Sequence, residues 1–169
     1  MKNLTLIGFM GAGKSAVGSL LAHRLKMGFV DLDEAISREA GMSVEEIFER
    51  EGEEGFRDRE SRALREELQQ EGIVLACGGG IVVRPENVRL LRDRCTVFYL
   101  RASRDSILRR VGGGEGRPLL AGGRVAERVE ELLSRREEAY RQAAHYVVDT
   151  DGRSVEEVVE EIAGIWLRN

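Results

Sequence analysis

The segment from Leu4 to Leu20 constrains the fold most, because it joins a short apolar run, a glycine-rich turn and the start of an apolar-periodic helix. The turn fits the pattern G-x-x-x-x-G-K-[ST], with Gly8, Gly13, Lys14 and Ser15 in the fixed positions. Glycines let backbone N–H groups converge on a phosphate, and the new helix adds unpaired N–H groups and the positive end of its dipole. We therefore expect a phosphate-binding P-loop, in which Lys14 reaches the β- and γ-phosphates and the Ser15 hydroxyl holds Mg²⁺.

The rest of the chain alternates apolar runs with helical patterns, which indicates a parallel α/β sheet flanked by helices. The expected strands are Leu4–Ile7, Gly28–Asp31, Ile73–Cys77, Cys95–Leu100 and Tyr146–Val148. The expected helices are Lys14–Leu25, Asp33–Glu39, Val44–Glu49, Phe56–Gln70, Pro85–Arg92, Ser103–Val111, Val125–Gln142 and Val155–Leu167. Ser43 with Glu46 fits a capping box, and Pro85 suits a first helical turn. Since no linker or repeat interrupts the pattern, we expect residues 1–169 to form one domain around a five-stranded parallel sheet.

Composition narrows the class of protein further. The chain has 169 residues, of which 42% are hydrophobic and 33% charged, as in a globular protein with one buried core. No apolar run approaches the ~20 residues of a membrane span, and the first apolar stretch continues into the P-loop rather than into a signal-peptide cleavage site. The two cysteines, Cys77 and Cys95, provide neither a disulfide framework nor a metal cluster. The net charge of −4 gives no support for nucleic-acid binding. We expect a cytoplasmic monomer that binds neither nucleic acid nor a membrane.

Two acidic residues and three glycines follow predicted strands. Asp31 and Asp33 come at the end of the second strand, and Gly78-Gly79-Gly80 follow the third. Ligand sites in such sheets lie beyond the carboxyl ends of the strands, so one carboxylate can help to hold Mg²⁺ through water while the other faces an acceptor hydroxyl. The alternative is that one carboxylate only caps the next helix, and Asp33 could do both. Three successive glycines favour a loop that contacts substrate over a plain tight turn.

Two further segments are candidates for binding charged groups. Arg57 could grip a carboxylate through two hydrogen bonds, with Glu60 on the same helical face to orient it, although helical Arg–Glu pairs are common in this chain. The segment 112–124 is rich in glycine and contains Arg117, Pro118 and Arg124. A loop of this length is either a lid that closes on phosphates or a loose surface loop, and its arginines favour the lid.

In their order along the chain, these segments resemble shikimate kinases. The resemblance is carried by Gly8–Ser15, Asp31–Asp33, Phe56–Glu60, Gly78–Gly80, Arg117–Leu120 and Arg135-Arg136, and it extends over nearly the whole chain. It implies a P-loop kinase fold of the nucleoside-monophosphate-kinase type, with a glycine-rich lid at about residues 112–124. It also implies ATP-dependent phosphorylation of the shikimate 3-hydroxyl, on the route to aromatic amino acids.

The resemblance also implies roles for individual residues. Asp33, Lys14 and Arg117 would be catalytic, and Mg²⁺ would be bound by Ser15 and, through water, by Asp31. The residues expected to bind shikimate are Asp33, Arg57, Gly79, Gly80 and Arg136, with Glu60 supporting Arg57. The residues expected to bind ATP are Gly11, Ala12, Gly13, Lys14, Ser15, Ala16, Arg110, Arg117 and Arg153, with Arg110 and Arg153 flanking the adenine.

Two positions depart from the family's usual pattern. Ala16 stands where the family usually has Thr or Ser, so one hydroxyl near the α-phosphate is lost while the backbone N–H remains. Val155 stands where a proline is often found near the adenine. Both departures bear on nucleotide affinity rather than on the reaction.

Two other functions compete with this interpretation. One is another small-molecule kinase of the same fold, such as a gluconate or nucleotide kinase, which fold alone does not distinguish. Arg57 with Arg136, a pair suited to one carboxylate, favours shikimate over these acceptors. The other is a nucleotide-binding regulatory module without turnover. The residues whose joint presence argues against it are Lys14, Ser15, Asp31, Asp33 and Arg117.

Overall fold

The computed structural model describes residues 2–111, 119 and 124–169. Within them lies a five-stranded parallel sheet with the strand order β2-β3-β1-β4-β5. The strands are β1 (Asn3–Ile7), β2 (Gly28–Asp31), β3 (Ile73–Ala76), β4 (Cys95–Arg101) and β5 (Tyr146–Asp149). The predicted α/β fold with a five-stranded parallel sheet is confirmed, and each expected strand agrees to within one residue at either end.

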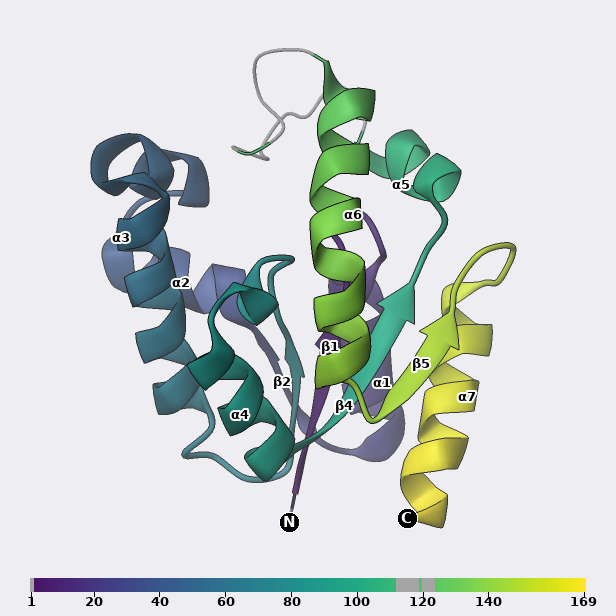
Figure 1. Cartoon of the computed structure of the whole chain (residues 1–169). Helices are drawn as coiled ribbons and strands as arrows, with labels where there is room; N and C mark the ends of the chain where they lie inside the picture. The colour runs from purple at the N-terminus through teal and green to yellow at the C-terminus, as the bar shows by residue number, and fades with distance from the viewer. Residues whose placement is uncertain (1, 112–118, 120–123) are drawn as a thin grey trace.

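Helices connect the strands and cover the sheet (Figure 1). They are α1 (Lys14–Leu25), α2 (Leu32–Ala40), α3 (Val44–Glu67), α4 (Pro85–Arg94), α5 (Arg104–Val111), α6 (Val125–Ala143) and α7 (Val155–Arg168), with a 3₁₀ turn, η1 (Ile81–Val83), before α4. In Figure 1, α4 and α6 lie in front of the sheet, α1 lies behind it and packs against α7, and α2 and α3 lie together to the left. None of the helices described is long and apolar enough to cross a membrane.

The sequences of the central strands reflect this double cover. All residues of β1 and of β3 are buried, as expected for parallel strands with helices on both faces. β3 is apolar throughout, whereas β1 also buries the polar residues Asn3 and Thr5. The outer strands β2 and β5 keep partly exposed residues. The strands all run in one direction, so their carboxyl ends share one edge, at the end of the molecule opposite both termini (Figure 1).

One helical segment differs from the prediction of two helices at Val44–Glu49 and Phe56–Gln70. The structure has a single element, α3, which the predicted Ser43–Glu46 capping box begins and which ends at Glu67. The backbone of Gly52 leaves the helical region inside it, with φ 74° and ψ 177°. Such angles are essentially restricted to glycine, so Gly52 kinks the element between the two predicted pieces.

Candidate active site

The loop between β1 and α1 leaves the first turn of α1 open to an anion. Gly13 is the N-cap residue in a left-handed conformation (φ 87°), and no described side chain caps this helix, as is also the case for α4 and α6. Gly8 serves the close approach of β4, because a Cβ there would lie 2.5 Å from the carbonyl oxygen of Leu100. The uncapped N–H groups and the helix dipole suit a phosphate.

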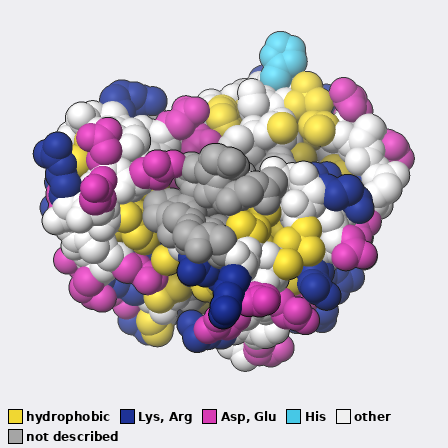
Figure 2. Space-filling model, turned by 90° about the horizontal axis from the view of Figure 1, so that it is seen from above, with side chains coloured by type: hydrophobic (Ala, Val, Ile, Leu, Met, Phe, Trp, Pro, Cys, Tyr) yellow, Lys and Arg dark blue, Asp and Glu magenta, His cyan; other side chains and the backbone are white. Residues whose placement is uncertain are grey.

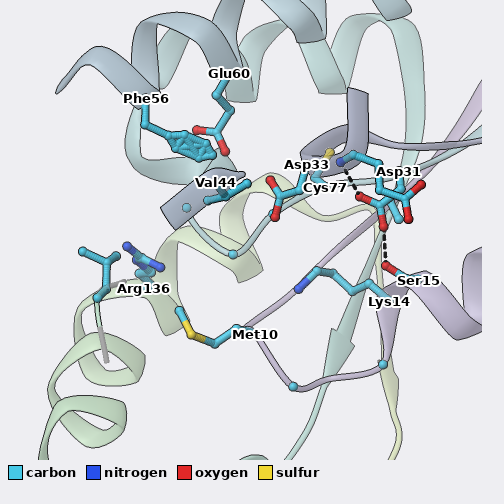
Figure 3. A pocket seen from close by; sticks show the side chains of 18 of the residues that line it. Met10, Lys14, Ser15, Asp31, Asp33, Val44, Phe56, Glu60, Cys77 and Arg136 are labelled. Carbon is cyan, nitrogen blue, oxygen red and sulfur yellow. Dashed lines mark hydrogen bonds between the residues drawn. The ribbon is translucent and has the colours of Figure 1, made fainter. Parts of the chain in front are cut away.

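Lys14 adds a cation to this loop. The side chain is buried, and its Nζ donates to the carbonyl oxygens of Gly8 at 2.6 Å and Phe9 at 3.0 Å. Figure 3 shows the Lys14 ammonium directed toward the middle of the pocket, with Asp33 and Arg136 around the same space. The loop thus combines backbone donors and a held positive charge, as binding of a polyphosphate requires.

Ser15 and Asp31 bring two oxygen atoms together beside the loop. Ser15 Oγ donates to Asp31 Oδ2 at 2.5 Å, and Asp31 Oδ1 accepts the Glu34 N–H at 3.2 Å (Figure 3). A hydroxyl and a carboxylate oxygen are hard donors of the kind that Mg²⁺ prefers, so these residues fit that ion. Within residues 2–111, 119 and 124–169, no group of three or more acidic, histidine or cysteine side chains could enclose a metal. Mg²⁺ is often bound in this way, with water and substrate phosphates completing its shell.

The same contacts correct one expectation about the two aspartates. Asp31, the last residue of β2, is the N-cap of α2. The suggestion that Asp33 could cap the helix is wrong, because α2 begins at Leu32 and Asp33 already lies in its first turn. The Asp33 side chain is therefore left for the pocket. Its Oδ1 is buried and has no hydrogen-bond partner in the part of the chain that the structure describes. Burial, with Asp31 nearby, raises the pKa of Asp33, although Lys14 and Arg57 oppose the shift.

Arg57 and Glu60 form a buried pair on the pocket-facing side of α3. Arg57 Nη1 donates to Glu60 Oε1 at 2.9 Å, and Arg57 Nη2 also contacts the half-exposed Glu53 at 3.4 Å. Within the described ranges, Arg57 Nε and Glu60 Oε2 are buried without a hydrogen-bond partner. The predicted Arg57–Glu60 interaction is confirmed, and it leaves part of the guanidinium available for another anion.

The three glycines after β3 each lie against one charged side chain of the pocket. A Cβ would lie 2.7 Å from Asp33 Oδ1 at Gly78, 3.6 Å from Arg136 Nη1 at Gly79, and 2.5 Å from the guanidinium carbon of Arg57 at Gly80. A side chain at Gly78 or Gly80 would therefore collide with Asp33 or Arg57, whereas the contact of a Cβ at Gly79 with Arg136 would be an ordinary one. These contacts are between residues far apart in the chain, so the sequence alone indicated only that something approaches this loop closely.

Arg136 completes the group of charges. It is buried on α6, and its Nη1 has no hydrogen-bond partner among the described residues. In the part of the chain that the structure describes, four of the five buried side-chain atoms without a partner belong to pocket residues, namely Asp33, Arg57, Glu60 and Arg136. Unpaired buried groups are costly unless a ligand satisfies them, so their gathering in one cavity marks a binding site.

The pocket itself has a volume of about 540 Å³ and lies at the carboxyl ends of β1, β2 and β3. Figure 2, which looks down on this end of the molecule, shows acidic and basic side chains interspersed over this face. One wall is apolar and was missed by sequence reasoning: Met10, Val44, Phe48 and Phe56, with the rings of Phe48 and Phe56 4.8 Å apart. Helical periodicity identified the aromatic residues only as apolar positions, which is equally consistent with a core.

The other predicted residues divide between the pocket and its surroundings. Gly11, Gly13, Ala16 and Arg110 line the pocket, and Arg110 Nη1 donates to the Gly11 carbonyl oxygen at 3.0 Å. Ala12 is buried within the turn, where its N–H donates to Phe9. Arg153 does not line the pocket and pairs with Glu161 at 2.6 Å, while Val155 is the first residue of α7. Arg117, and with it most of the predicted lid, lies outside the described residues.

This arrangement can bring two reactants together. One end of the pocket has the donors for a polyphosphate, and the other has two arginines for an anion and a buried carboxylate facing the space between. Phosphoryl transfer requires this combination of positioning and charge neutralisation more than covalent chemistry by the protein.

Comparison with known proteins agrees with this geometry. A family model described as shikimate kinase matches residues 10–165. The shikimate kinases of Thioalkalivibrio sulfidiphilus and Geobacter sulfurreducens are 47% and 48% identical, and the matches cover 99% and 96% of this chain and 88% and 89% of those proteins.

Solved structures give the same result. The structure titled shikimate kinase from Acinetobacter baumannii in complex with shikimate has a TM-score of 0.97 and 37% identity, covering 100% of this chain and 94% of that one. The shikimate kinase of Aquifex aeolicus has a TM-score of 0.84 and 34% identity, covering 95% of this chain and 94% of that one. With these similarities spanning its full length, the chain belongs to the shikimate kinase family.

Proposed function

We propose that the chain is an ATP-dependent kinase that phosphorylates the 3-hydroxyl of shikimate and forms shikimate 3-phosphate. One observation carries the proposal: Arg57 and Arg136 face the same pocket as the P-loop, and each has a buried guanidinium nitrogen without a partner among the residues that the structure describes. Shikimate has one carboxylate and several hydroxyls. Its carboxylate would satisfy the arginines and direct a hydroxyl toward the nucleotide.

At the shikimate end, each group has a distinct task. Arg57 and Arg136 hold the carboxylate, and Glu60 orients Arg57 through the 2.9 Å hydrogen bond. Gly79 and Gly80 line the site, and Gly80 leaves room for the Arg57 guanidinium group. The apolar wall of Phe48 and Phe56 covers the ring carbons of the substrate.

Asp33 orients the attacking hydroxyl and accepts its proton. Its Oδ1 has no other hydrogen-bond partner, and its raised pKa moves the carboxylate toward the range in which a general base works well. The position in the first turn of α2 keeps the carboxylate close to both Lys14 and Arg57, whose charges limit that rise.

At the nucleotide end, the P-loop with Gly11, Gly13, Lys14 and Ala16 binds the phosphates, and Arg110 covers the loop. The Ser15 hydroxyl and, through water, Asp31 would hold Mg²⁺, which neutralises charge on the β- and γ-phosphates when bound. Arg117 would reach the transferring phosphoryl group and Arg153 the adenine. We further propose that the protein acts as a cytoplasmic monomer of one domain.

An acceptor panel tests the reaction. ADP formation is measured with ATP, Mg²⁺ and shikimate, gluconate or a nucleoside monophosphate. We expect turnover with shikimate far above that with the other two acceptors. Preferential turnover of gluconate or a nucleotide would favour another kinase of the fold, and nucleotide binding without turnover would favour a regulatory module.

Substitution of the two arginines tests the carboxylate site. Arg57→Lys and Arg136→Lys keep the charge but lose the planar two-bond grip, so each is expected to weaken shikimate binding by about 1.5–3 kcal/mol, roughly ten- to a hundredfold. Arg135→Lys is the matched control, because Arg135 is exposed and pairs with Glu131 on the surface of α6. Normal shikimate binding by both pocket variants would contradict the proposed carboxylate site.

A further inference from the structure

Tyr140 connects helix α6 to the glycine loop. The side chain is fully buried, and its hydroxyl donates to the Gly79 carbonyl oxygen at 2.5 Å. Tyr140 follows Arg136 by one helical turn and lies on the same face of α6. A Cβ on Gly79 would lie 3.6 Å from Arg136 Nη1 and 3.7 Å from Tyr140 Oη, so both side chains meet the loop at one residue.

The position of Tyr140 is itself fixed. Its ring centroid lies 5.1 Å from that of Tyr99 on β4, and the Tyr99 hydroxyl donates to Glu137 Oε2 at 2.5 Å. Burial raises the pKa of Tyr140 to about 12, although the charge of Arg136 opposes the shift. The hydroxyl therefore keeps its proton and remains a donor at neutral pH.

A second buried hydrogen bond holds the loop two residues after Gly79. Asn87 of α4 donates from Nδ2 to the Ile81 carbonyl oxygen at 3.1 Å, which fixes the start of η1. The peptide between Gly79 and Gly80 is trans, so the Gly80 N–H points opposite to the carbonyl that Tyr140 holds. The hydroxyl of Tyr140 thus sets the orientation of a peptide that lines the pocket.

We propose that Tyr140 is a positioning residue for the shikimate carboxylate, acting through the Gly79–Gly80 peptide against which the guanidinium groups of Arg136 and Arg57 lie. Tyr140 does not line the pocket, so it acts on the substrate only through these groups. The inference rests on the proposed function, because it assigns Tyr140 to the same substrate site.

A matched pair of variants tests this role. Tyr140→Phe removes the hydroxyl that holds the loop. Tyr99→Phe removes a buried hydroxyl from the same ring pair, but its hydrogen bond leads to Glu137. We expect Tyr140→Phe to raise the KM for shikimate roughly three- to tenfold, the effect of one lost hydrogen bond, with kcat and the KM for ATP near wild type. Tyr99→Phe should leave all three constants near those of wild type.

A shikimate analogue with a carboxamide in place of the carboxylate provides the second measurement. If Tyr140 acts through the carboxylate site, Tyr140→Phe weakens binding of shikimate but adds little to the weak binding of the analogue. Both variants are assayed well below their unfolding midpoints, so that only folded protein contributes.

Three results would overturn the inference: an unchanged KM for shikimate in Tyr140→Phe, an equal rise in Tyr99→Phe, or an equal loss of affinity for shikimate and its carboxamide. Wild-type protein that does not phosphorylate shikimate would instead contradict the proposed function. The wild-type assay decides that point before the variants are compared.

Discussion

Burial of Glu60 in the folded protein disfavours the ionised form of its carboxyl group. Its side chain is 1% exposed, Oε1 pairs with Arg57, and Oε2 has no partner. Burial raises its pKa from 4.5 to about 7, although Arg57 opposes the rise. Between these two pH values the folded state binds more protons than the unfolded state, so Glu60 lowers the free energy of unfolding as the pH rises through this window.

We predict that Glu60→Gln flattens the pH dependence of stability. The free energy of unfolding is measured with denaturant at about pH 5 and at about pH 7.5. Between these pH values, the free energy of unfolding of wild type should fall by up to about 3 kcal/mol more than that of the variant, at 1.36 kcal/mol per pKa unit. Glu53→Gln is the control, because Glu53 also contacts Arg57 but is 49% exposed. Equal pH slopes for wild type and Glu60→Gln would show that Glu60 is not the titrating group.

At the scale of elements, helix α3 has a kink between its capped start at Ser43 and the pocket-facing Arg57. It depends on the backbone of Gly52, and a Cβ there would meet no atom within 4 Å. The cost of a substitution at this position is therefore backbone strain alone.

We predict that Gly52→Ala lowers the free energy of unfolding by about 1–3 kcal/mol. Gly164→Ala, the same change in the regular helix α7, should raise it by up to about 1 kcal/mol, because the nearest atom to the new Cβ is the flexible Arg168 guanidinium at 3.5 Å. Urea unfolding of the two variants compares them directly. Stabilisation by both substitutions would mean that the kink is not required.

At the scale of the whole molecule, one pocket is assembled from distant parts of the chain. The P-loop comes from β1 and α1, Arg57 from α3, and Arg136 from α6. Each ligand that binds only the folded state should therefore stabilise the whole protein by mass action, by about 2.7 kcal/mol at a concentration of 100 Kd.

We predict that Lys14→Ala weakens binding of the nucleotide but not binding of shikimate. In thermal unfolding, a non-hydrolysable ATP analogue with Mg²⁺ should raise the Tm of this variant much less than that of wild type, because Lys14 is the buried cation of the P-loop. Stabilisation by shikimate should remain, because Arg57 and Arg136 are unchanged. Exposed Lys2→Ala serves as the control and should respond to both ligands as wild type does. Loss of both shifts in Lys14→Ala would indicate a damaged fold rather than a damaged nucleotide site.

The sequence alone determined the features that depend on residues close together in the chain. The P-loop, the five strands and the Ser43–Glu46 capping box follow from glycine conformation, from apolar runs and from a hydrogen bond between residues three apart. The Arg57–Glu60 pair could be predicted for the same reason, since both residues lie on one helical face. Local reasoning also singled out Asp33, Arg57 and the glycine loop as candidates for contact with a substrate, whereas Arg136 and the identity of the substrate came from the resemblance alone.

Only the tertiary structure decided which distant groups meet. It placed Asp33, Arg136 and Arg57 against Gly78, Gly79 and Gly80, and it set the Tyr140 hydroxyl on the Gly79 carbonyl. These contacts join segments as much as 61 residues apart, and propensity or periodicity carries no information about such pairs. They arise because the parallel strands carry the loops that follow them to one edge of the sheet, where α6 packs against the glycine loop.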